Sequence, residues 1–122
     1  KKFGNSVKII PVPGPNAAVA ALSVSGINAD KFLFLGYPPH KKGRKSFFQE
    51  ILESKYPVVF YESVHRILKT LKELEKIVSE RKVIVCRELT KKFETIYRGT
   101  IEEIIPKIEK EKLGEFVVIV SR

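Results

Sequence analysis

The hydrophobic positions of the chain fall into short uninterrupted runs and into longer runs with helical spacing. A short run at 7–10 predicts a strand, and residues 93–99 alternate as a strand with one wetter face does. The other uninterrupted runs are rich in β-branched and aromatic residues, and we expect the one at 57–60 to be a central strand. They predict strands covered on both faces, at 32–35, 57–60, 82–86 and 115–120.

The strongest helical pattern follows the run at 57–60, where apolar residues recur at helical spacing from Val64 to Val78 with lysines on the other side. Ser63 is expected to be the N-cap of this helix. A second helix is predicted after the capping box that Thr100 forms with Glu103. Pro106 falls inside that helix and should kink or shorten it.

Two further helices are predicted in the first half of the chain. Asn16 to Leu22 is small and apolar nearly all round, follows a proline-rich turn, and should end at Gly26 in a left-handed cap. Another amphipathic pattern begins at Ser46. Strands and helices therefore mostly alternate along the chain.

This order predicts a single α/β domain over residues 1–122, with a mixed, mostly parallel sheet of five to six strands and helices on both faces. Only a few residues separate 82–86 from 93–99, so these two strands should form an antiparallel hairpin.

Composition excludes several protein classes. With 122 residues, 43% of them apolar and 30% charged, the chain suits one soluble globular domain. No apolar stretch approaches the thickness of a bilayer and the first residues lack the apolar core of a signal peptide, so a cytoplasmic location is expected. The single cysteine, Cys86, lies in an apolar run and is expected to be a buried core thiol, and no metal site is predicted.

The positive net charge of the chain makes a polyanionic partner plausible. The chain has 23 Lys and Arg against 14 Asp and Glu, a net charge of +9. A lysine-rich, heat-adapted composition would also give such a balance. However, basic residues are concentrated at 40–45, which we call the basic loop and which follows a predicted strand. Such loops are often merely solvated, but this one could hold the backbone of a nucleic acid.

Three loops with polar or charged residues follow predicted strands, at 13–17, 61–66 and 87–92. In open α/β sheets, ligands bind beyond the carboxyl ends of the strands. We therefore expect the turns bearing Asn16, Tyr61 and Thr90 to open on one rim of the sheet. The alternatives are purely structural roles: a Glu62–Arg66 ion pair with a half-exposed His65, and ion pairs of Arg87 and Glu88 with their neighbours.

The sequence motifs in these loops resemble those of the C-terminal domain of the tetrapyrrole (corrin/porphyrin) methylase superfamily. The specific phrases are F-Y-E-S-x-H-R at 60–66 and R-E-L-T-K at 87–91, while P-G-P-x-A at 13–17 is shared more widely. The resemblance covers about Val7 to Val120. Within the superfamily it is closest to the branch that methylates the ribose 2′-hydroxyl of a cytidine in small-subunit 16S rRNA.

The resemblance implies half of a two-domain enzyme that holds S-adenosylmethionine in the cleft between its domains. The N-terminal domain would be absent here, the isolated chain inactive, and the whole protein a homodimer acting on 16S rRNA or the small ribosomal subunit. By position, the residues that would contact the cofactor are Asn16, Ala17, Tyr61 and Leu89.

Methyl transfer to a hydroxyl needs a positioned acceptor oxygen and a base that removes its proton. Glu62 and Glu88 are the catalytic candidates. The RNA track would position the phosphate backbone without reading sequence, and its residues would be Lys41, Lys42, Arg44, Lys45, His65, Arg66, Arg87, Lys91 and Lys92.

Two other functions remain open at the level of sequence. A member of the superfamily acting on a small tetrapyrrole precursor should have an apolar acceptor cleft and no salt-dependent RNA binding. A module for RNA binding or dimerisation would have no chemistry of its own.

Overall fold

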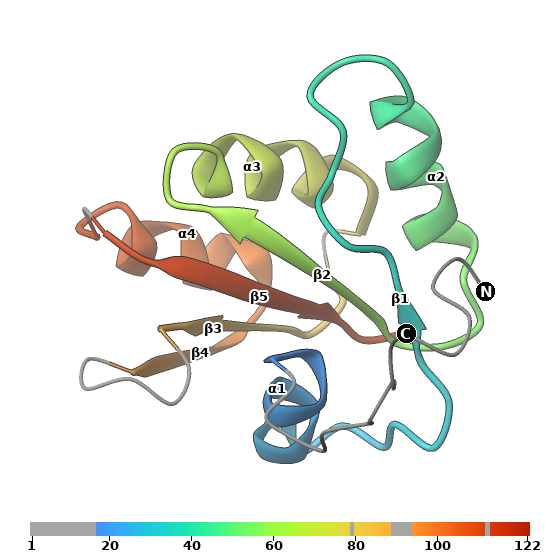
Figure 1. Cartoon of the computed structure of the whole chain (residues 1–122), viewed down its shortest axis with the longest axis horizontal. Coiled ribbons are helices and arrows are strands. Elements are labelled where there is room, and N and C mark those ends of the chain that lie inside the picture. The colour runs from blue at the N-terminus through green and yellow to red at the C-terminus, as the bar shows by residue number, and fades with distance from the viewer. Residues whose placement is uncertain (1–16, 79, 89–93, 112) are drawn as a thin grey trace, which may run out of the picture.

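The computed structural model describes residues 17–78, 80–88, 94–111 and 113–122, which form a single sheet with helices on both faces (Figure 1). The strand expected at 7–10 and the proline-rich turn after it lie outside the described residues. In chain order the described elements are α1 (Ala17–Ser25), β1 (Leu33–Phe34), α2 (Arg44–Glu53), β2 (Val58–Ser63), α3 (Ile67–Val78), β3 (Val83–Arg87), β4 (Thr95–Gly99), α4 (Ile101–Ile108) and β5 (Glu115–Val120).

The five described strands are ordered β1-β2-β5-β3-β4. β1 pairs with β2 in parallel, whereas the pairs β2–β5, β5–β3 and β3–β4 are antiparallel. The mixed α/β class and the hairpin of β3 with β4 are therefore confirmed, but the expectation of mostly parallel pairing is wrong. The reason is that β5 inserts between β2 and β3 and runs against both of them.

Because β5 runs against β2 and β3, those two strands share one direction, and β1 shares it too. The carboxyl ends of β1, β2 and β3 therefore meet at one edge of the sheet, together with the amino ends of β4 and β5. We call this edge the carboxyl rim; it runs from Phe34 through Ser63 and Glu115 to Arg87 and Thr95.

Alternation along the strands divides the core into two layers. On one face, Val58 and Phe60 of β2 pack with the apolar stripes of α2, α3 and α4. On the other face, Val59 packs with Ala18 and Ala21 of α1, whose small side chains let the helix approach the sheet. Figure 1 shows α1 on the opposite side of the sheet from α3 and α4.

One expectation about strands is confirmed and another is corrected. The run at 57–60 lies in β2, which has β1 on one side and β5 on the other and is therefore a central strand, as expected. The run at 32–35 was expected to be covered on both faces, but β1 has only two residues and Phe34 is 45% exposed. The physical reason is that β1 is the outermost of the described strands and has β2 as its one described neighbour.

Helix starts also differ from expectation at two places. Ser63 is not an N-cap, because it continues the ladder of β2 opposite Glu115, and a turn precedes the start of α3 at Ile67. α2 begins at Arg44 rather than Ser46, because Gly43 adopts the left-handed φ of 86° that turns the basic loop into the helix. The left-handed cap at Gly26 is confirmed by its φ of 77°.

The expectation for Cys86 is confirmed, since its side chain is fully buried in β3. Burial raises the pKa of the thiol to about 11, so the group stays protonated at neutral pH. Among the described residues, no helix is long and apolar enough to cross a membrane.

The capping box predicted at Thr100 is confirmed at the start of α4, and it makes the stability of the fold depend on pH. The Glu103 carboxylate accepts from the Thr100 backbone N–H and hydroxyl, which lowers the pKa of Glu103 from its ordinary value of 4.5. A lowered pKa adds stability that is complete above pH 4.5 and is lost as the pH falls through the folded-state value.

We therefore expect Glu103→Ala to lower the free energy of unfolding at neutral pH, and the difference from wild type to shrink in acid. Urea unfolding at both pH values measures it. Glu102→Ala, an exposed neighbour outside the box, is the control. A difference that is independent of pH would contradict the role of the charge.

Candidate functional site at the carboxyl rim

The ends of three strands are fastened together at the carboxyl rim. Ser63 of β2 lies opposite Glu115 of β5. On the other side, the Glu88 N–H donates to the Glu115 carbonyl (3.0 Å) and the Glu115 N–H donates to Glu88 Oε1 (3.1 Å). Glu88 has a φ of 54°, a left-handed backbone that non-glycine residues rarely adopt and that marks it as a candidate functional residue.

The carboxyl ends of β2 and β3 therefore share one rim, as expected. Tyr61, Ser63, Arg87 and Glu88 reach the same edge. Asn16 and Thr90, which should complete it, lie outside the described residues, as do Leu89, Lys91 and Lys92. Ala17 is described, and it is the exposed first residue of α1.

Aromatic rings cover the β1 side of the rim. The Tyr61 ring meets Phe34 and Tyr37 edge to face, at 5.0 and 5.6 Å between centroids. Tyr37 is 52% exposed, and its hydroxyl donates to Glu115 Oε2 at 3.4 Å. Partial burial and the negative charge of Glu115 raise the pKa of the Tyr37 hydroxyl, so it remains a donor at neutral pH.

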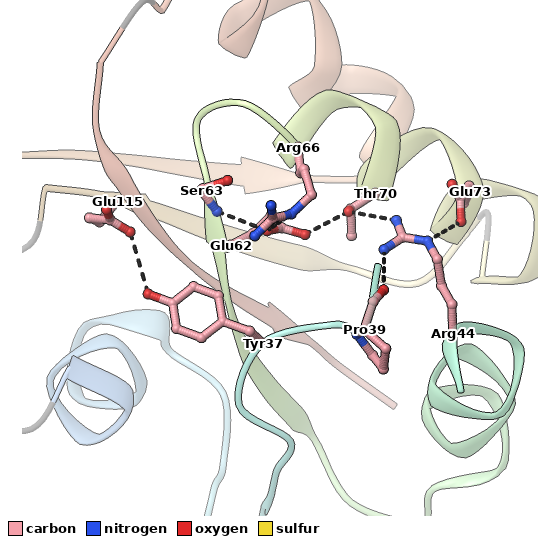
Figure 2. A network of polar contacts seen from close by, with 9 residues as sticks. All are labelled: Tyr37, Pro39, Arg44, Glu62, Ser63, Arg66, Thr70, Glu73 and Glu115. Atoms are coloured by element: carbon pink, nitrogen blue, oxygen red, sulfur yellow. Dashed lines mark hydrogen bonds and ion pairs between the residues drawn. The ribbon is translucent and has the colours of Figure 1, made fainter. Parts of the chain in front are cut away.

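Glu62 points from β2 to the opposite face of the sheet, toward α3, where its carboxylate is fully buried (Figure 2). Oε1 accepts from the Ser63 N–H at 2.9 Å and from Arg66 Nε at 3.3 Å. Oε2 accepts from the Thr70 hydroxyl at 2.7 Å. The Glu62–Arg66 ion pair, the purely structural alternative, is thus part of the structure.

This geometry corrects the expectation that Glu62 is a catalytic base. A general base must reach the proton that it removes, but both oxygens of this carboxylate are held by protein donors and no part of it is exposed. Glu88, the other candidate, is half-buried at the rim itself.

Arg44 also differs from its predicted role. It was expected in the RNA track, yet it is only 8% exposed. Its guanidinium donates to Glu73 Oε2 (2.8 Å), the Pro39 carbonyl (2.8 Å) and the Thr70 hydroxyl (2.9 Å), and it lies over the Phe48 ring. α3 supplies an acidic and a hydroxyl partner that turn this cation inward, so it cannot contact a phosphate.

The other basic candidates divide into two groups. Arg87 donates to the Leu113 carbonyl (2.8 Å) and pairs with Glu111 (3.0 Å), so its expected role in the RNA track is not supported. Arg66 is held by Glu62. The remaining described candidates are exposed: Lys41, Lys42, Lys45 and His65. Lys41 and Lys45 line an open hollow with Gly43, Ser46 and Gln49.

Sequence reasoning missed several residues of this region: Tyr37, Thr70, Glu73 and Glu115. Thr70 had a detectable signal, because it is a hydroxyl within the core-facing stripe that Ile67, Leu71 and Leu74 form on α3. Glu115 and Tyr37 had none, since a strand start and a loop tyrosine carry no pattern that pairs them.

One polar atom at the rim is left over. Among the described residues, the Ser63 hydroxyl oxygen is a buried side-chain atom without a hydrogen-bond partner. Such groups are rare in native structures, which marks this hydroxyl as a candidate for contact with a group beyond the described residues. The described residues contain no group of three or more His, Cys, Asp or Glu that could hold a metal ion.

Comparison with known proteins gives a consistent set of relatives. The profile of the family described as Tetrapyrrole (Corrin/Porphyrin) Methylases matches residues 1–105. Proteins named Ribosomal RNA small subunit methyltransferase I are 42% identical in Halalkalibacterium halodurans, 44% in Vibrio cholerae and 37% in Thermotoga maritima. These matches cover 94%, 93% and 94% of this chain but 40%, 41% and 52% of the relatives, so the chain spans about half their length or less.

Solved structures share the fold at low sequence identity. The methyltransferase CobJ has a TM-score of 0.71 at 17% identity, over 97% of this chain and 52% of its own. Uroporphyrin-III C-methyltransferase from Thermus thermophilus, complexed with S-adenyl homocysteine, has a TM-score of 0.57 at 16% identity, over 88% of this chain and 50% of its own. At these identities the likeness concerns the fold alone.

The buried Glu62 carboxylate should matter for stability. Because Thr70, Ser63 and Arg66 would lose their acceptor, we expect Glu62→Ala to lower the free energy of unfolding by about 3 to 5 kcal/mol. Urea unfolding measures the change. Glu50→Ala, exposed on α2, should stay within about 0.5 kcal/mol of wild type. Equal stability of the two variants would contradict the assigned network.

Proposed function

The chain belongs to the tetrapyrrole (corrin/porphyrin) methylase family, and from this premise we propose that it is the C-terminal half of a methyltransferase acting on small-subunit rRNA. The acceptor in this proposal is the ribose 2′-hydroxyl of a cytidine, and the methyl donor is S-adenosylmethionine. Relatives at 37 to 44% identity, named for small-subunit rRNA, support the substrate class.

The observation that carries the proposal is the position of the basic loop. It follows β1, whose carboxyl end belongs to the rim, and it exposes Lys41, Lys42 and Lys45, of which Lys41 and Lys45 line one hollow. Lysines in such a position neutralise phosphates and fix the register of an RNA strand without reading its bases. Tyr61 and Glu88 would then lie at the edge to which the loop leads.

Residues at the rim fit the cofactor in two respects. The buried Ser63 hydroxyl lacks a partner within the described residues, and Tyr61, two positions earlier on the same face of β2, offers an aromatic ring. When bound, S-adenosylmethionine supplies a methyl group on a sulfonium for in-line transfer to oxygen. In this proposal Tyr61 and Ala17 contribute contacts, as would Asn16 and Leu89 outside the described residues.

We assign the removal of the hydroxyl proton to Glu88. Its strained backbone is held in place by reciprocal bonds with Glu115, so the residue is fixed at the rim. Positioning of the acceptor oxygen would supply most of the rate, because the displacement needs a linear approach. In this proposal Glu62 stabilises the end of β2 through its hydrogen bond with the Ser63 N–H, and it does not act as the base.

The proposal includes a second domain and a homodimer. The matched segment covers 40% and 52% of two curated relatives, which supports a cleft formed with a further domain. With one half of the cleft, the 122-residue chain alone should transfer methyl groups negligibly. Robust turnover by this chain with S-adenosylmethionine and RNA would overturn the two-domain part of the proposal.

An alternative acceptor is a small tetrapyrrole precursor, as the name of the uroporphyrin-III C-methyltransferase suggests. Identities of 17 and 16% to the solved structures carry only the fold, whereas the rRNA relatives share more than twice that identity. The exposed lysines also favour a polyanion. Absence of salt-dependent RNA binding would turn the assignment toward the small acceptor.

The test removes the lysines of the loop. In the full-length protein, Lys41→Ala, Lys42→Ala and Lys45→Ala together should weaken binding to a small-subunit rRNA hairpin. The plot of log affinity against log salt should become shallower by about 0.7 to 0.9 for each phosphate that the protein no longer neutralises. Affinity for S-adenosylmethionine, measured by calorimetry, should not change.

A matched control removes the same charge elsewhere. Lys55, Lys107 and Lys110 are exposed and lie outside the basic loop, so changing all three to alanine should alter RNA affinity less. If both triple variants bind RNA equally well, net charge alone accounts for binding and the loop has no special role.

A further inference from the structure

Arg44 closes the basic loop on itself. The loop leaves Pro39 and ends in the first turn of α2, where Arg44 sits. Arg44 Nη1 donates to the Pro39 carbonyl at 2.8 Å, so one side chain joins the start of the loop to its end. The Arg44 N–H also donates to the Lys41 carbonyl at 3.1 Å. The exposed lysines between these points are carried on a closed turn.

The same side chain fastens the loop to α3. Nη2 donates to the Thr70 hydroxyl at 2.9 Å and Nε donates to Glu73 Oε2 at 2.8 Å. The planar guanidinium has donors in a fixed fork, and here each nitrogen has its own protein partner. A lysine could not reproduce these three directions from one ammonium group.

Thr70 links the Arg44 guanidinium to Glu62, and through Glu62 to the rim. Its hydroxyl accepts from Arg44 and donates to Glu62 Oε2 at 2.7 Å. The other oxygen of Glu62 holds the N–H of Ser63, the last residue of β2 at the rim. Figure 2 shows this chain of contacts running from Pro39 through Arg44, Thr70 and Glu62 to Ser63. Thr70 is fully buried, so water does not compete for these bonds.

We propose that Arg44 and Thr70 are positioning residues that hold the exposed lysines of the basic loop at a fixed place relative to the rim, so that a bound RNA backbone is aligned with the site. The cation of Arg44 binds no phosphate; it places Lys41, Lys42 and Lys45, which do. We call the contacts of Arg44 with Pro39, Thr70 and Glu73 the brace. The consequence for RNA rests on the proposed function, whereas the brace itself rests only on these contacts.

The test uses Thr70→Val, which keeps the shape of the side chain and the net charge but removes the shared hydroxyl. Thr70→Ser, which keeps a hydroxyl, is the matched control. In the full-length protein, trypsin cleavage after Lys41 or Lys42 should become about tenfold faster in the valine variant, equal to about 1.4 kcal/mol of reduced protection. Thr70→Ser should resemble wild type.

RNA binding is the second readout. With its charge unchanged, Thr70→Val should still give weaker binding of the rRNA hairpin and a shallower dependence of log affinity on log salt, because fewer phosphates are engaged at once. A purely structural role would lower the melting temperature but leave that slope unchanged. Arg44→Lys provides a second variant with the charge retained, should the valine variant fold poorly.

The outcomes separate the two proposals. Cleavage at the wild-type rate in both Thr70→Val and Arg44→Lys would overturn the brace. Faster cleavage with unchanged RNA binding, while the triple lysine variant binds weakly, would overturn the positioning role and leave the proposed function standing. If the triple lysine variant binds RNA like wild type, the proposed function fails, and the cleavage rates alone still decide the brace.

Discussion

The insertion of β5 between β2 and β3 is the constraint on which the rest of the structure depends. Its apolar residues fill the centre of both core layers, and its antiparallel ladders leave β2 and β3 with a common direction. The ends of both strands therefore meet at the carboxyl rim beside Glu115. Without that insertion, Ser63 and Glu88 would have no shared neighbour.

Burial of Glu62 is the main unfavourable feature that this arrangement has to offset. An unpaired carboxylate in the interior is costly, and it is retained here because three donors surround it. One of them, Thr70, also receives the Arg44 guanidinium, so the buried negative and positive groups are joined by a hydroxyl. The same bonds connect the surface that carries exposed lysines to the end of β2.

Local signals were sufficient for much of the fold. Periodicity predicted the described helices and strands, and the cap at Gly26 and the box at Thr100 were found because backbone requirements of helix ends are met by neighbouring residues. The rim was anticipated from strand ends alone. Pairing direction and the exposure of Phe34 were not, since both depend on which strand lies alongside.

The sequence by itself determined the element types, the buried Cys86 and the presence of a basic loop, because each follows from residues close together in the chain. Only the tertiary structure decided which charges face solvent. Arg44 looked the same as its neighbours Lys41 and Lys45, yet its partners Thr70 and Glu73 lie 26 and 29 positions away on α3. Contacts over such separations form only when the sheet brings α2 and α3 together, and no local pattern records them.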